Sequence, residues 1–274
     1  MKPFLQTILF LSILTPFVMN DCYTQNQDTV KNTQNFETVV FDYPKTTYPV
    51  NSFELIKGIP VIPLYNGLFA AGKNLWIKQP EGENVLSLCT SIVNNSIYYI
   101  TQDSVGDATI HQKFPKSENV VDSVLKKFRK GYFQIKSVGI DTLVLWGIQD
   151  SLFKVKYLLK DTVIDIYSSK NPFTDVFPVS SSVIIIAFDY DIFLLSNVSE
   201  PKRIISSEYQ IESITFNEEG TIFISTEVGI FTKEKKSGKL VPLIVNTHGI
   251  LKSSKKGLFI LQPDNFRILL FNLE

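Results

Sequence analysis

A short pattern of strand-forming residues recurs along this chain and limits its fold more than any other feature. Its clearest copy, residues 221–232, reads TIFISTEVGIFT, and β-branched and aromatic residues of this kind favour strands. Gly220 and Gly229 supply the backbone freedom that tight turns require. Side chains alternate across a strand, so Ile222 and Ile224 share one face and Phe223 lies on the other. The segment predicts a hairpin that is apolar on both faces and lies between two other sheets.

Six segments share this form, in which a small or polar residue precedes an apolar run. They begin at Asn74, Ser96, Thr142, Ser182, Thr221 and Gly257. The last five are spaced at about 40 residues, which is the period of a four-stranded β-propeller blade. The first interval is too short, so the segment at Asn74 is either a truncated blade or a false match. We therefore predict an all-β propeller of six blades, or of five or seven, each a four-stranded antiparallel sheet.

The ring of a propeller must be closed, because an unpaired sheet edge invites association with other chains. The last repeat supplies only three strands, at residues 249–251, 257–261 and 266–271. We expect an early strand, at residues 38–41 or 53–56, to cover the open edge of this last blade.

One segment has helical spacing. Its apolar residues follow a helical period, and basic residues crowd the end before Gly131, where the helix dipole favours them. The apolar set is Val120, Val121, Val124, Leu125 and Phe128. This pattern predicts a short amphipathic helix over residues 118–130, and the outer strand of a blade is the alternative.

Residues 220–231 resemble the propeller repeats of two-component regulator sensor domains, in which a glycine, an aromatic strand and a threonine precede a second glycine and strand. Residues 67–77, reading GLFAAGKNLWI, are similar. The resemblance implies a propeller fold and an extracytoplasmic location. It does not carry a sensor role over to this chain.

The N-terminal segment is typical of a secretory signal peptide. An apolar run broken by Pro16 follows Lys2, and it is too short and too interrupted for a membrane span. We predict a signal peptide over residues 1–24, a flexible leader over 25–35 and a single propeller domain over 36–274. The mature protein would be secreted, periplasmic or on the cell surface, with no stable membrane span after cleavage. An uncleaved anchor and a lipid on Cys22 are the alternatives.

Charge and cysteine content exclude several classes of protein. Lysine and arginine together number 27, as do aspartate and glutamate, and a neutral chain has no long-range attraction to nucleic acid. Basic runs at residues 126–130, 233–236 and 252–256 are therefore interpreted as solvated sheet edges. Cys89 lies in an apolar segment, which predicts a buried, unreactive thiol.

Motifs that carry chemistry are scarce. There is no glycine-rich phosphate loop, nucleophile elbow or paired-cysteine motif, and His111 and His248 lack partners at ligand spacing, so both are expected to be ordinary strand or turn residues. We assign no catalytic, cofactor-binding or metal-ligating residue and expect no cofactor. One arrangement stays open: Asp175, Glu212 and His248 lie at or just before inner strands, where they could hold a divalent cation. The alternative is that they only hydrate the mouth of the channel.

Two functions follow from this sequence. The preferred one is a non-enzymatic binding module that holds a protein, peptide or glycan on one face of the propeller, without nucleic acid. The alternative is a metal-dependent hydrolase similar to the lactonase-type six-bladed propellers.

Overall fold

The structure is a computed structural model that describes residues 38–273 except 47–49, 65–66, 71–74, 79–83, 92–95, 114–121, 139–141, 161, 197–198 and 236. All of these residues belong to one compact unit, residues 35–274. The predicted signal peptide, leader and Cys22 lie outside the described residues. No helix among the described residues is long and apolar enough to cross a membrane.

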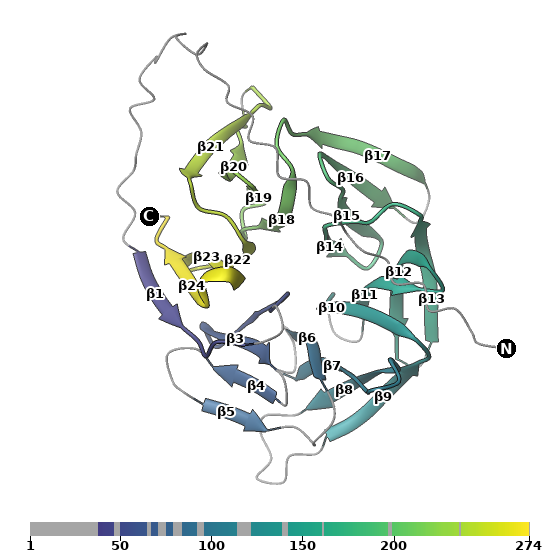
Figure 1. Ribbon diagram of the computed structural model, residues 1–274. Coiled ribbons are helices and arrows are strands. Elements are labelled where there is room, and N and C mark those ends of the chain that lie inside the picture. Colours follow the sequence, from purple (N-terminus) through teal and green to yellow (C-terminus); the bar gives the residue numbers. More distant parts are fainter. Residues whose placement is uncertain are drawn as a thin grey trace, which may run out of the picture. The chain divides into compact units, whose positions relative to one another are not determined.

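Six four-stranded antiparallel sheets surround a central axis, so the predicted six-bladed β-propeller is confirmed (Figure 1). Blade 1 consists of β2 (Glu54–Ile56), β3 (Ile59–Leu64), β4 (Gly67–Ala70) and β5 (Leu75–Lys78). Blade 2 consists of β6 (Asn84–Thr90), β7 (Ile97–Gln102), β8 (Ala108–Lys113) and β9 (Asp122–Phe128). Blade 3 consists of β10 (Gly131–Ser137), β11 (Thr142–Gln149), β12 (Leu152–Leu159) and β13 (Thr162–Ser169). Blade 4 consists of β14 (Asp175–Ser180), β15 (Val183–Ala187), β16 (Asp191–Ser196) and β17 (Ser199–Ser206). Blade 5 consists of β18 (Ile211–Phe216), β19 (Ile222–Thr226), β20 (Gly229–Lys233) and β21 (Leu240–Val245). Blade 6 consists of β22 (Ile250–Ser254), β23 (Gly257–Gln262), β24 (Arg267–Phe271) and β1 (Thr38–Asp42).

The hydrophobic core is divided into layers, one between each pair of neighbouring blades. The predicted hairpin of residues 221–232 shows why both strand faces must be apolar. Ile222 and Ile224 pack in the layer between blades 4 and 5, and Phe223 packs in the layer between blades 5 and 6. A strand buried on both faces contributes apolar burial to two layers at once.

The predicted helix over residues 118–130 is wrong where the structure describes that segment. Residues Asp122–Phe128 form β9, which pairs antiparallel with β8 as the outer strand of blade 2. Phe128 and Leu125 pack on the core, whereas Val124, which a helix would bury with them, is 54% exposed. Pairing with the free edge of β8 outweighs the local helical spacing, because that edge would otherwise stay unpaired.

The segment at Asn74 was a false match to the second strand of a blade. Residues 75–78 form β5, the outer strand of blade 1, and the second strand is β3. β3 contains Pro60 and Pro63, and proline is unusual inside a sheet because it donates no ladder hydrogen bond. Because of these prolines, the sequence pattern did not identify β3 as the second strand of the first blade.

The N-terminal strand closes the ring, as predicted for residues 38–41. β1 pairs with β24 along five residue pairs, from Thr38 with Phe271 to Asp42 with Arg267 (Figure 1). The Phe41 ring stacks on Phe259 with centroids 6.2 Å apart. Residues 54–56, the other candidate, instead form the inner strand of blade 1.

Tyr43, directly after β1, is buried in the layer between blades 6 and 1. Its ring is buried edge-on against Phe266, and its hydroxyl has no hydrogen-bond partner among the described residues. Burial, reinforced by the negative charge of Asp264, raises the pKa of Tyr43 to about 12. A tyrosine that keeps its proton longer when folded makes unfolding easier as pH rises from about 10 towards 12, since the unfolded side chain ionises first.

We expect Tyr43→Phe to remove this alkaline loss of stability, by up to about 2 kcal/mol at the upper end of the window. At neutral pH the variant should be at least as stable as the wild type, because it no longer buries an unpaired hydroxyl. Urea unfolding of both proteins between pH 8 and 11.5 measures the difference. Parallel curves over this range would show that Tyr43 ionises equally in the folded and unfolded chains.

Candidate functional site

The described residues line two cavities in the channel between the six inner strands, β2, β6, β10, β14, β18 and β22. The upper cavity, about 200 Å³, is lined by residues at or near the starts of inner strands, among them Ser52, Asp175 and Glu212. The lower cavity, about 280 Å³, is lined by residues nearer the strand ends, among them Thr90 and Phe216. Lys136 and Lys252 line both cavities. We call the end of the propeller at which the inner strands begin the upper end, and the upper cavity is the one nearer to it.

Two ion pairs lie between the cavities. Lys136 Nζ is 2.8 Å from Asp175 Oδ1 and also donates to the Val176 carbonyl oxygen at 2.7 Å. Lys252 Nζ is 2.7 Å from Glu54 Oε2. Each charge is balanced by an opposite one, because the desolvation cost of an unpaired charge here would be high.

Asp175 holds three blades together. Its Oδ2 accepts hydrogen bonds from Ser213 Oγ at 2.9 Å and from the Ile214 N–H at 3.0 Å, both on blade 5. Its Oδ1 accepts from the Val176 N–H as well as from Lys136 on blade 3. A carboxylate that accepts four hydrogen bonds within the protein has little capacity left for a metal ion.

Two serines repeat this arrangement on other inner strands. Ser87 Oγ accepts from the Ile135 N–H at 3.2 Å, and Ser213 Oγ accepts from the Leu251 N–H at 3.1 Å. In each case a buried polar side chain binds a backbone N–H of the next blade. These residues therefore position neighbouring blades and satisfy buried polar groups.

The electrostatics of Lys136 follow from its burial. Its ammonium lies over the Trp146 ring, 5.0 Å from the centroid, and its side chain is 18% exposed. Desolvation lowers the pKa of Lys136, and the attraction of Asp175 works against that change. Removing either Lys136 or Asp175 would therefore leave the other charge desolvated and unpaired, which would destabilise the folded protein.

Glu212 and His248 form a third pair, at the upper end of the channel. His248 Nδ1 is 2.9 Å from Glu212 Oε2, and both side chains are partly exposed. Ser225 Oγ donates to the same carboxylate oxygen and accepts from the Gly249 N–H. With a proton on Nδ1, His248 donates to Glu212 and leaves Nε2 as an acceptor.

The three residues singled out for a cation are thus divided between two roles. The structure brings Glu212 and His248 together, whereas Asp175 is occupied by Lys136 and blade 5. Within the described residues, no three His, Cys, Asp or Glu side chains are grouped so that they could hold a metal ion.

Sequence reasoning missed the lysines of the channel. Lys252 was interpreted as part of a solvated basic run, yet it points into the channel and pairs with Glu54. Lys136 lies on β10, where its neighbour Ile135 is buried. The available signal was a single charge alternating with buried apolar residues on an inner strand.

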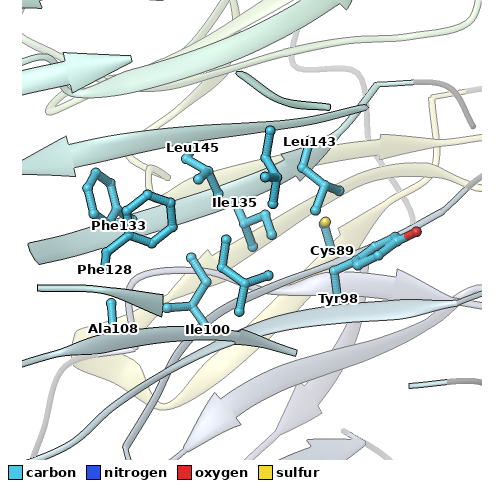
Figure 2. Packing of buried hydrophobic residues seen from close by; sticks show 11 residues of the cluster. Cys89, Tyr98, Ile100, Ala108, Phe128, Phe133, Ile135, Leu143 and Leu145 are labelled. Carbon is cyan, nitrogen blue, oxygen red and sulfur yellow. The ribbon is translucent and has the colours of Figure 1, made fainter. Parts of the chain in front are cut away.

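The structure places His111 in a strand and Cys89 in the core, the locations expected from the sequence. His111 lies in β8, stacks on Tyr99 with centroids 4.7 Å apart, and shares a 2.9 Å hydrogen bond with Thr101. Cys89 is buried between blades 2 and 3, and Figure 2 shows its sulfur among the apolar side chains of that layer. Burial raises the pKa of the Cys89 thiol, and the negative charge of Glu54 adds to the rise, which keeps the thiol protonated and unreactive.

Comparison of the sequence with protein-family models gives no match, and comparison with curated proteins gives none either. Solved structures do match. A gluconolactonase from Xanthomonas campestris superposes with a TM-score of 0.63 at 8% identity, covering 85% of this chain and 89% of the other. The extracellular domain of BT4673 from B. thetaiotaomicron, described as a one-component system, has a TM-score of 0.53 at 13% identity, covering 87% of this chain and 40% of the other.

PorZ from Porphyromonas gingivalis, a bacterial surface component of the type-IX secretion system, has a TM-score of 0.55 at 11% identity. The match covers 81% of this chain and 38% of PorZ. Both an enzyme and extracellular proteins are therefore among the similar structures. At these identities the similarity establishes the propeller fold only, so the function has to be inferred from the side chains of the site.

Proposed function

We propose that this protein is an extracytoplasmic, non-enzymatic binding module whose ligand face is the upper end of the propeller. The observation that carries the proposal is the exposure of large apolar side chains on loops at that end, Tyr190 and Tyr209 among them. The loop of Tyr209 leads directly into the inner strand β18, which places it at the upper end. Exposed aromatic side chains are enriched at binding surfaces.

The channel supports a binding role for a different reason. Its two lysines, Lys136 and Lys252, are partly buried and paired with carboxylates, and its most buried carboxylate, Asp175, is occupied by neighbouring blades. Groups committed to holding blades together are poorly suited to exchange protons with a substrate. The extracellular proteins among the similar structures are in keeping with the extracytoplasmic location.

A hydrolase is the second candidate, and one pair of residues favours it. Glu212 orients His248 as a carboxylate orients the base of a hydrolase, and Glu212 lines the upper cavity. This function predicts lactone hydrolysis that is lost in both His248→Ala and Glu212→Gln. We expect instead that purified protein hydrolyses gluconolactone no faster than these two variants, with or without added calcium.

The binding proposal is tested by site-specific photocrosslinking in the native cells. A photoreactive amino acid is placed at Tyr190 on the upper end, or at Val179 near the end of the inner strand β14, at the opposite end. These sites are comparably exposed, at 51% and 55%. We expect a discrete adduct from position 190 and none from position 179. Equal or absent labelling at both positions would contradict a ligand face at the upper end.

A further inference from the structure

Backbone hydrogen bonds join four loop segments at the upper end of blades 4 and 5. The Ser207 N–H donates to the Tyr190 carbonyl at 2.8 Å, linking the β15–β16 turn to the loop before β18. The Glu227 N–H donates to Gln210 at 3.3 Å, and the Asn246 N–H donates to Val228 at 3.0 Å. The β19–β20 turn is thereby tied to its neighbours on both sides. We call this continuous surface, residues 189–190, 207–210, 227–228 and 245–246, the blade 4–5 rim.

The rim exposes four large apolar side chains. Tyr190 and Val245 are more than half exposed, and Tyr209 and Val228 are exposed by 37% and 38%. The Tyr209 ring stacks on Phe231 of β20, with centroids 5.7 Å apart and planes 27° apart, and this contact holds Tyr209 in place. A group of exposed apolar side chains on ordered loops marks an interaction surface rather than scattered surface residues.

The charge of the rim has one sign. Asp189, Glu208 and Glu227 are exposed on it, and the rim segments contain no lysine or arginine. Among the described residues, no ion pair involves these three acids. Because the whole chain is neutral, this is a local excess of negative charge that favours a cationic partner and repels anionic surfaces.

We propose that the blade 4–5 rim binds a cationic peptide segment of a partner protein, one in which lysine or arginine alternates with apolar residues. The inference rests on the proposed binding function and names its partner class. Basic side chains would pair with Asp189, Glu208 and Glu227, and apolar ones would pack on Tyr190 and Tyr209. An arginine can also stack on a tyrosine ring, which adds a cation–π contribution.

The probe for this site is a fluorescent peptide in which lysine alternates with leucine and tyrosine, and its control replaces each lysine with glutamate. Binding is measured by fluorescence anisotropy with the mature protein at low and at physiological salt. We expect the lysine peptide to bind, more weakly at higher salt, and the glutamate peptide not to bind.

Two rim variants and one control locate the site. Tyr190→Ser combined with Tyr209→Ser removes the aromatic contacts, and Asp189→Asn combined with Glu208→Gln and Glu227→Gln removes the charge. Each should weaken lysine-peptide binding about tenfold, corresponding to about 1.4 kcal/mol. Val179→Ser, which changes an equally exposed residue at the opposite end, should bind like the wild type. Tyr209→Ser also removes the ring contact with Phe231, so the double tyrosine variant should melt a few degrees lower, whereas the charge variant and Val179→Ser change exposed residues and should melt close to the wild type.

Equal binding by the wild type and both rim variants would overturn the assignment, because the peptide would then bind elsewhere. A wild type that binds neither peptide, or both equally, would overturn the partner class. Neither result would affect the crosslinking comparison of the two ends, so this inference can fail while the proposed function stands.

Discussion

A chain that begins at Tyr43 is expected to unfold or aggregate under conditions in which a chain that begins at Asn35 stays folded and monomeric. The shorter chain lacks β1, which supplies the outer strand of blade 6 through its five residue pairs with β24. It also lacks Phe41, which stacks on Phe259 in the layer between blades 6 and 1. Removing β1 therefore exposes apolar surface and the unpaired edge of β24 together.

Thermal unfolding and size-exclusion chromatography measure this effect. We expect the melting temperature to fall by roughly 10 °C or more, since several kcal/mol are lost and a chain of this size shifts by about 2–4 °C per kcal/mol. Val39→Ser, which changes an exposed residue of β1 and keeps its backbone pairing, is the matched control and should melt near the wild type. A monomeric short chain with an unchanged melting temperature would show that β1 does not hold the ring closed.

The repeat and the closure could be predicted from the sequence because each has a local signature. Residues 221–232 alternate apolar side chains on both faces, and the last repeat visibly lacks a strand. The two errors arose where pairing outweighed local pattern. Residues 122–128 have helical spacing but complete a sheet, and β3 contains prolines that strands normally exclude.

The site was less predictable because it depends on which inner strands face one another across the channel. Asp175, Glu212 and His248 were correctly placed near inner strands, but their partners come from other blades. Nothing local links Lys136 to Asp175, or Lys252 to Glu54, which are far apart in the sequence. A charge that alternates with buried residues indicates a channel position, and its partner is set by the ring.

Asp175→Asn is expected to destabilise the protein by about 3 kcal/mol, the lower end of the range for buried pairs, because it leaves the partly buried Lys136 without its counter-charge. The amide keeps the size of the side chain and one acceptor oxygen, but its NH2 group replaces an oxygen that accepts two hydrogen bonds, so the loss combines the missing charge with lost hydrogen bonds. Lys136→Met should cost less, since Asp175 would keep the hydrogen bonds from Val176, Ser213 and Ile214. Urea unfolding of the two variants gives both values.

The double variant Lys136→Met with Asp175→Asn separates this account from simple disruption of packing. We expect it to be more stable than Asp175→Asn alone, because replacing both partners of a buried ion pair removes the unpaired charge. Independent packing defects would instead add, and the double variant would then be the least stable of the series.

The pH dependence of Asp175→Asn supplies the sharpest test of the ion pair. Burial already holds the pKa of Lys136 below its ordinary value, and loss of Asp175, which raises it, should lower it further. A lysine whose pKa is lower in the folded chain than in the unfolded chain binds fewer protons when folded, so stability rises with pH between the two values. The deficit of Asp175→Asn relative to wild type should therefore shrink as the pH rises towards the ordinary pKa of lysine. In the Lys136→Met background the same substitution should cost an amount that does not change with pH, because the lysine paired with Asp175 is no longer there to give up its proton.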